Sequence, residues 1–315
     1  MKKLHVPPAL ALFLLSPAIG ELLSGSSPPL EFFNPFGFLL LASLYGSGAV
    51  LVRELKTRWH RDYRGLLLLG GAYGILEEGL MVKSFFDPNW IDLGILGSFG
   101  RWMDVNWIWA EMLTIYHAVF SITIPIMLIE LAYPQDKYDK WVSKRWFATL
   151  TIILVAVTGI GYFFLTQYRP PMPQYLLAAL AMTLFIYAGY KLTPKKTHTS
   201  IKKTGSARRL FIISSAASFA FFLLFNGGPH IISNPIIIML LGAIFILCAA
   251  WYVNRFDWRL PESTINRLSM VSGGLAFMIF LAFLMEFEGI TGMSVVSLSA
   301  VVALLLLRRK IKQAG

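Results

Sequence analysis

The chain has 315 residues, of which 56% are hydrophobic and 14% charged, and its mean hydropathy is +0.63. This composition excludes an ordinary soluble domain and predicts an all-α, polytopic integral membrane protein. The net charge of +11 would suit a nucleic-acid-binding protein if the 28 Lys and Arg residues shared one face. They fall instead in alternate segments between apolar runs, which argues against nucleic acid and leaves the lipid bilayer as the partner.

Ten apolar runs are long enough to cross about 30 Å of hydrocarbon. They cover residues 7–23, 36–52, 65–85, 107–131, 146–166, 172–191, 210–226, 235–253, 268–286 and 291–307. All nine tryptophans lie near the ends of these runs, as expected for side chains at a membrane interface. With the basic segments placed inside, the sequence predicts a multi-pass protein of the cell membrane with both termini in the cytoplasm.

The first run follows Lys2 and Lys3, so it has two interpretations. It is either a retained membrane helix or the apolar region of a signal peptide. No small-x-small cleavage site ends the run, and Glu21 with the Pro28-Pro29 turn suits an outer loop, so a retained helix is favoured.

The third run contains two adjacent carboxylates, Glu77 and Glu78. A charged group at membrane depth costs roughly 2.5 kcal/mol or more, so such groups usually face a cavity, a partner or a substrate. His117 is expected at nearly the same depth in the fourth run, with Glu111 nearer the outer boundary and level with Lys83. Because neighbouring helical residues point about 100° apart, we expect only one of the two glutamates to face the site.

The outer segment from Phe86 to Asn106 is long for a connector and rich in aromatic residues. It is interpreted either as a lid over the outer half of the bundle or as a packed loop. Its polar side chains at Asp87, Asp92, Arg101 and Asp104 are candidate contacts, and Lys83, Asp87, Arg101, Asp104 and Glu111 form the predicted substrate-binding set.

Residues 191–209 are polar, basic and rich in turn formers. They are interpreted as a cytoplasmic linker between a membrane domain of residues 1–190 with six helices and one of residues 210–315 with four. Cys248 is the single cysteine, so no internal disulfide forms.

A third polar element, Asn226 to Pro235, lies on the outer side between the seventh and eighth runs. Pro229 is suited to open a helix, which would place His230 and Asn234 one turn apart on one face. That pair suits binding of a metal, a water or a developing oxyanion.

Glu77-Glu78, His117 and the later His230–Asn234 pair resemble the ordered EExxxR, FxxxH and HxxxN motifs of the CAAX-protease and bacteriocin-processing family of intramembrane peptidases. Val82 stands at the Arg position, with Lys83 one place later, and Leu113 replaces the Phe. The resemblance implies that Glu77 or Glu78 activates water, that His117 and His230 assist, and that Asn234 helps to hold an oxyanion.

Three functional classes remain open. In an intramembrane hydrolase, Glu77 or Glu78 acts as general base with His117, and a divalent metal is compatible but not required. In a transporter, the same groups bind a cation, a proton or a small polar substrate. In a structural or assembly subunit they only fix helix packing. The substrate and the oligomeric state are not readable from the sequence.

Overall fold

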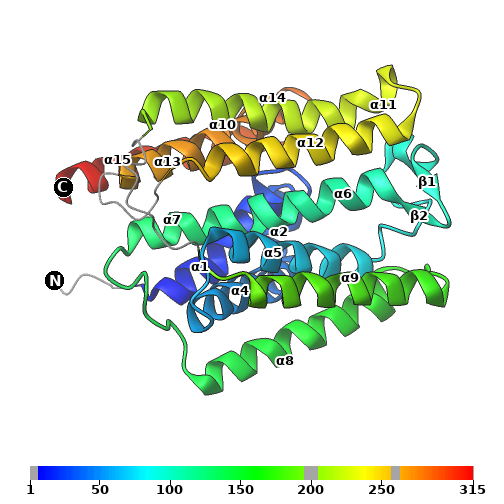
Figure 1. The fold of residues 1–315 in the computed structure, drawn as a ribbon, viewed down its shortest axis with the longest axis horizontal. Helices are drawn as coiled ribbons and strands as arrows, with labels where there is room; N and C mark the ends of the chain where they lie inside the picture. The colour runs from blue at the N-terminus through cyan, green and yellow to red at the C-terminus, as the bar shows by residue number, and fades with distance from the viewer. Residues whose placement is uncertain (1–5, 195–204, 257–262, 315) are drawn as a thin grey trace.

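The computed structural model describes residues 6–194, 205–256 and 263–314, and its helices lie side by side with their axes roughly aligned (Figure 1). The central part of the predicted linker, residues 195–204, lies outside the described residues. Each of the ten predicted apolar runs is helical, so the all-α prediction is confirmed.

Several of the long helices change from α to π geometry partway along. In the N-terminal part these helices are α1 and η1 (Pro8–Pro17, Ala18–Leu22), α3, η2 and α4 (Pro35–Leu41, Ala42–Gly46, Ser47–Arg58), and α5 and η3 (Tyr63–Gly74, Ile75–Met81). They continue with α6, η5 and α7 (Trp107–Tyr116, His117–Thr123, Ile124–Ala132), α8 and η6 (Lys144–Ile160, Gly161–Leu165), and α9 (Met172–Lys191); a short α2 spans Pro29–Phe32. π-Helical turns are rare and often mark functional sites, so their positions guide the search below.

The C-terminal helices form a second group that packs mainly on one long helix of the first. They are α10, η7 and α11 (Ala207–Phe222, Leu223–Gly227, Gly228–Ile231), α12 (Pro235–Val253), α13 and α14 (Ser263–Gly274, Ala276–Phe287), and α15 (Met293–Ala314). In this group α10 packs on α13 and α14 packs on α15. The group meets the rest of the protein where α12 packs on α6 and where α13 and α15 pack on α7 (Figure 1).

Polar residues define where several helices begin. The Asn106 side chain accepts a hydrogen bond from the Trp109 amide at the start of α6 (2.9 Å), and Ser143 accepts one from the Trp146 amide at the start of α8 (3.3 Å). These bonds satisfy amides that have no partner in the first helical turn. Asn234 does the same for Ile236 at the start of α12 (3.0 Å), and Pro235 follows it at the first helical position.

Within the described residues, seven helices are long and apolar enough to cross a membrane. They are Pro35–Arg58, Trp107–Ala132, Lys144–Leu165, Met172–Lys191, Ala207–Ile231, Pro235–Val253 and Ser263–Phe287. The first helix, Pro8–Leu22, is apolar but shorter. The structure therefore supports a multi-pass membrane protein.

The outer segment from Phe86 to Asn106 is folded and packed onto the bundle. It contains a 3-10 turn, η4 (Gly94–Gly97), and a two-stranded antiparallel hairpin of β1 (Arg101–Trp102) and β2 (Val105–Asn106). Leu93, Leu96 and Val105 are buried in the same core cluster as Trp109. The outer segment therefore has the conformation of a packed loop. Its hairpin is a small β element that the sequence did not predict.

Candidate functional site

The centre of the candidate site is the imidazole ring of His117, which lies between two carboxylates. The Nε2 atom of His117 is 3.0 Å from Oε1 of Glu78, and Nδ1 is 3.4 Å from Oε2 of Glu77. All three side chains are buried, and their donor atoms lie within 4.8 Å of one another. The glutamate pair and His117, expected at nearly equal depth on consecutive apolar runs, therefore lie in contact.

Both glutamates approach the same ring, whereas the sequence predicted that only one would face the site. The difference comes from the backbone, because Glu77 and Glu78 lie in the π-helical segment η3. A π turn closes on the fifth residue and contains more residues than an α turn, so neighbouring side chains diverge by less than 100°. Figure 1 shows α5, which leads into η3, beside α6, which leads into η5 and His117.

A hydrogen-bonded chain holds the Glu78 carboxylate in place. The Ser84 hydroxyl donates to Oε2 of Glu78, and the Trp109 indole N–H donates to Oγ of Ser84 (3.0 Å). Trp109, Ser84, Glu78 and His117 thus form one continuous buried chain from α6 through η3 to η5. Such a chain fixes the orientation of the carboxylate, which is what a general base requires.

Three tyrosine rings surround His117. The ring centroids of Tyr45, Tyr73 and Tyr116 lie 6.0, 6.1 and 5.2 Å from that of His117. Two of their hydroxyls bond to the first helix, since Tyr116 donates to the Gly20 carbonyl (2.6 Å) and Tyr45 donates to Oε1 of Glu21. These rings pack around the imidazole and place hydroxyl groups near it.

The first helix is part of this site. Besides the bonds at Gly20 and Glu21, the Ser16 hydroxyl donates to the Ser121 carbonyl in η5 (2.6 Å). The sequence placed Glu21 in an outer loop, and this was wrong, because Glu21 lies within the helical segment η1. Its carboxylate accepts hydrogen bonds from Ser27 (2.8 Å), which is close in sequence, and from Tyr45, which is distant.

Two glycines let the aromatic groups approach closely. A Cβ atom at Gly48 would lie 2.1 Å from the Tyr73 ring, and one at Gly74 would lie 2.9 Å from Cβ of His117. Since side chains at these positions would overlap their neighbours, the glycines permit the contacts of the cluster.

The cluster contains more acidic groups than basic ones. Glu21, Glu77 and Glu78 face a single imidazole, and in the neutral ring the N–H at Nε2 donates to Glu78 while Nδ1 accepts from the Ser121 hydroxyl (3.1 Å). Oε2 of Glu77 and the Tyr73 hydroxyl are buried without a hydrogen-bond partner in the described part of the chain. Unpaired buried polar atoms are costly, so the arrangement is suited to take up a proton, a water molecule or a cation.

His230 and Asn234 do not join the cluster. His230 is exposed on the short helix α11, which packs on η7, α12 and the η4 turn. Asn234 is exposed and caps α12. Among the described residues, the group with metal-ligand geometry contains Glu77, Glu78 and His117 alone.

The predicted substrate-binding residues are dispersed. Lys83 is buried, and its ammonium donates to the carbonyls of Tyr162 (2.7 Å) and Thr166 (3.2 Å) at the end of η6. Asp87 accepts from the Asn89 amide in a turn (2.9 Å). The other three residues are Arg101, which donates to the Phe86 carbonyl; Asp104, which is exposed; and Glu111, which lies beside Gly242 of α12.

Sequence reasoning missed the residues that complete the cluster, namely Glu21, Tyr45, Tyr73, Ser84, Tyr116 and Ser121. Tyr73 and Tyr116 are close in sequence to Glu77 and His117, so helical neighbourhood was an available signal for them. Tyr45 and Glu21 come from other helices, and no local pattern points to them.

The fold and the site define an all-α, multi-pass membrane protein with a buried Glu-Glu-His cluster. Residues 10–311 match the sequence model of an uncharacterized membrane protein family, and the chain belongs to that family. No curated protein and no solved structure matches the chain.

Proposed function

We propose that this protein is an intramembrane hydrolase in which Glu77, Glu78 and His117 activate a water molecule. The observation that carries the proposal is the contact of 3.0 Å between Glu78 and His117, with Glu77 3.4 Å from the other ring nitrogen. A carboxylate bonded to an imidazole is a proton acceptor of fixed orientation, and proton transfer by such groups typically accelerates reactions by 10²–10⁴-fold.

The residues have distinct roles in this proposal. Glu78, oriented by Ser84, accepts the proton as the water oxygen attacks the carbonyl carbon of an amide or ester bond. The protonated Glu78 then gives that proton to the leaving nitrogen or oxygen as the bond to the carbonyl carbon breaks, while the Nε2–H of His117 keeps the carboxyl group in place. The Tyr73 hydroxyl, which has no partner among the described residues, is the donor available to a developing oxyanion.

A divalent metal fits the same three side chains. Catalytic zinc sites use three protein ligands and leave one position for water, and carboxylate and imidazole are both zinc ligands. A metal held by Glu77, Glu78 and His117 would replace the hydrogen bond between Glu78 and His117. It would supply Lewis acidity to the water, while Ser84 would keep Glu78 oriented.

The resemblance of Glu77-Glu78 and His117 to the intramembrane peptidase motifs supports an amide as the bond that is cleaved. The roles that the resemblance implies for His230 and Asn234 do not enter the proposal, because His230 is exposed on α11 and Asn234 caps α12. The hydrolase proposed here therefore relies on one histidine.

The test is turnover of purified protein in lipid nanodiscs, with a library of internally quenched peptides and a p-nitrophenyl ester series, with and without added Zn²⁺. We expect Glu78→Gln and His117→Ala to lose at least about 100-fold in kcat, the lower end of the acid-base contribution. His230→Ala, a matched exposed histidine, should retain wild-type turnover. Equal turnover by wild type and His117→Ala would contradict the proposal.

Transport is a second candidate, favoured by the excess of carboxylates in the cluster and by the unpartnered Oε2 of Glu77. Intramembrane acidic groups of this kind bind and release protons or cations in transporters. In reconstituted vesicles, this candidate expects pH- or cation-dependent flux that Glu77→Gln abolishes. Flux without hydrolysis would replace the hydrolase proposal with transport. Hydrolysis without flux would exclude transport.

We further propose that all ten helical runs cross the membrane, with both termini in the cytoplasm, and that residues 1–190 and 210–315 form two membrane domains joined by the 191–209 linker. The alternation of basic and weakly charged connections supports this topology. Because Cys248 is the single cysteine, single-cysteine variants in a Cys248→Ala background can be labelled from either side. Labels at residues 140 and 198 should share one side, opposite to a label at residue 104.

A further inference from the structure

A large groove runs between the two helix groups, on the face of α6 and η5 opposite to the Glu-His cluster. Its cavity has a volume of about 1810 Å³, which exceeds the roughly 300–1,000 Å³ of pockets for small ligands. Small side chains from α6 and η5 form its floor, among them Ala110, Thr114 and Ala118. Ala181 of α9 and Ala243 of α12 line opposite walls. Glu77, Glu78 and His117 do not line it, so the groove is separate from the proposed hydrolytic site.

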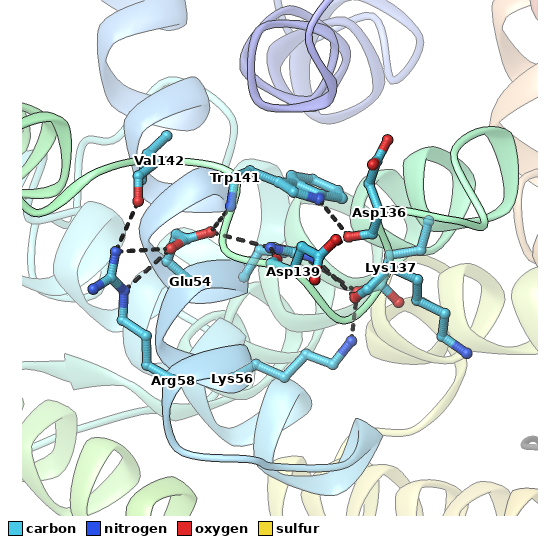
Figure 2. Close-up of polar contacts among 10 residues, drawn as sticks. Glu54, Lys56, Arg58, Asp136, Lys137, Asp139, Trp141 and Val142 are labelled. Carbon is cyan, nitrogen blue, oxygen red and sulfur yellow. Dashed lines mark hydrogen bonds and ion pairs between the residues drawn. The ribbon is translucent and has the colours of Figure 1, made fainter.

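One end of the groove is basic. Lys56, Arg61, Arg64 and Lys137 lie there together with Tyr63. Two of these cations have acidic partners, since Lys56 lies 2.5 Å from Glu130 and Arg64 lies 2.7 Å from Asp62. Lys137 has no carboxylate within 4.0 Å in the residues that the structure describes. In Figure 2 its side chain points away from the Glu54 and Arg58 pair, and its ammonium joins no dashed line.

Arg267 of α13 lies beside this end and, like Lys137 and Arg61, has no carboxylate within 4.0 Å among the described residues. It is only 7% exposed, and its guanidinium contacts two hydroxyls at long distance, that of Tyr63 (3.5 Å) and that of Thr264 (3.3 Å). Its Nε atom has no partner among the described residues. Burial lowers the pKa of Lys137, and the nearby Arg267 and Lys56 cations lower it further, against opposing effects of Tyr63 and Glu130.

Lys137 is half-buried and Arg267 is buried, and cations in such positions with no carboxylate partner among the described residues favour an anion. Here the anion would sit where an apolar groove begins, so the ligand must join a negative group to apolar chains. Basic pockets between membrane helices bind anionic lipid head groups in this way. We propose that the groove binds one anionic phospholipid, with its phosphate beside Lys137 and Arg267 and its acyl chains along the floor formed by α6 and η5.

The experiment compares lipid retention by the full chain. The protein is first exchanged into nanodiscs that contain equal amounts of phosphatidylglycerol and phosphatidylcholine. It is then released from the nanodiscs, and the lipid that stays bound is identified and quantified by native mass spectrometry. Wild type should retain phosphatidylglycerol in preference to phosphatidylcholine. Lys137→Gln and Arg267→Gln should each reduce that preference by about fivefold, the usual contribution of one basic residue at a membrane surface. Lys140→Gln, an exposed lysine in the same loop, is the matched control and should leave it unchanged.

A second pair of variants tests the acyl chains without touching a charge. Ala243→Trp fills the groove from α12 and should reduce retention of both lipids, whereas Ile244→Trp, on an adjacent exposed position that does not line the groove, should not. These variants also cover the case in which Arg267→Gln fails to fold. Equal retention of the two lipids by wild type would overturn the proposal. So would stabilisation by inorganic phosphate in detergent that matches the effect of phosphatidylglycerol, because it would make the site one for a free anion.

Discussion

The carboxylate of Glu78 and the imidazole of His117 are in hydrogen-bond contact at 3.0 Å, although 39 residues separate them in the chain. Glu78 is also bonded to Ser84, and Ser84 to Trp109, so one buried chain connects two helices and the start of the outer segment. This chain makes the orientation of Glu78 dependent on Ser84 and, through it, on Trp109.

Replacement of Ser84 by alanine should destabilise the protein and leave the Glu78 carboxylate less firmly oriented. The change leaves the buried Trp109 N–H and one oxygen of Glu78 without their partner, and each such loss costs about 1–3 kcal/mol. Chemical unfolding monitored by tryptophan fluorescence measures this loss in the free energy of unfolding. Ser98→Ala, an exposed serine of the outer segment, is the matched control. Identical unfolding midpoints for the two variants would show that the chain does not hold Glu78.

Gly48→Ala and Gly159→Ala should have opposite effects. A Cβ at Gly48 meets the Tyr73 ring at 2.1 Å, so the substitution displaces the tyrosine and costs roughly 1–3 kcal/mol by overpacking. Gly159 lies in α8 with nothing within 4 Å of its Cβ, so alanine there should add about 0.5–1 kcal/mol by favouring the helix. Thermal melts of both variants in the same detergent test this, and a stabilising Gly48→Ala would refute the close contact.

Glu130 is the partner of two cations at the basic end of the bundle. Its Oε1 lies 2.5 Å from Nζ of Lys56 and 3.8 Å from Nε of Arg53, and Arg53 is fully buried. Figure 2 shows the neighbouring contacts of Glu54 with Arg58 and Trp141. Glu130→Gln should cost about 3–5 kcal/mol, because Lys56 loses its carboxylate partner at a buried position while Arg53 keeps only Glu54.

Unfolding in increasing denaturant measures this loss. Glu31→Gln removes the same charge from an exposed position and should change stability by less than about 0.5 kcal/mol. If the two variants unfold at the same denaturant concentration, the buried ion pairs contribute no net stability.

Lys83→Met should loosen the end of η6 without abolishing the Glu-His contact. The ammonium of Lys83 donates to two carbonyls at this end and lies 4.5 Å from the Tyr162 ring centroid, while methionine preserves much of the volume. Hydrogen exchange should therefore increase at residues 162–168 and remain unchanged at residues 117–123. Increased exchange in both regions would assign Lys83 to the cluster instead.

The sequence predicted the helices and the three central residues of the site, Glu77, Glu78 and His117. Apolar length and basic flanks depend only on composition along the chain, so each of the ten runs could be located. Glu77, Glu78 and His117 stood out because ionisable groups are rare at membrane depth. The depth of His117 relative to the glutamates followed from a constant rise per residue.

Other features required the three-dimensional arrangement. Glu21 reaches the cluster because η1 packs on η5, and Tyr45 because its ring lies 6.0 Å from that of His117; contact between helices distant in sequence leaves no local pattern. His230 was assigned to the site from the spacing of His230 and Asn234 on one predicted helix face. In the structure Ile232 and Asn234 leave helical geometry, so α11 ends at Ile231 between the two residues, and α12 begins only at Pro235, after Asn234.

By itself, the sequence determined that this is an all-α membrane protein and that Glu77, Glu78 and His117 lie within its third and fourth apolar runs, because the cost of placing an ionisable group in an apolar run is a property of each segment. Tertiary structure decided which groups meet that charge. The π-helical turns direct both glutamates to one imidazole, and the packing of the first helix adds Glu21 and Tyr45 to the cluster. It also decided that Lys137 and Arg267, from different helix groups, lie together at the end of an apolar groove.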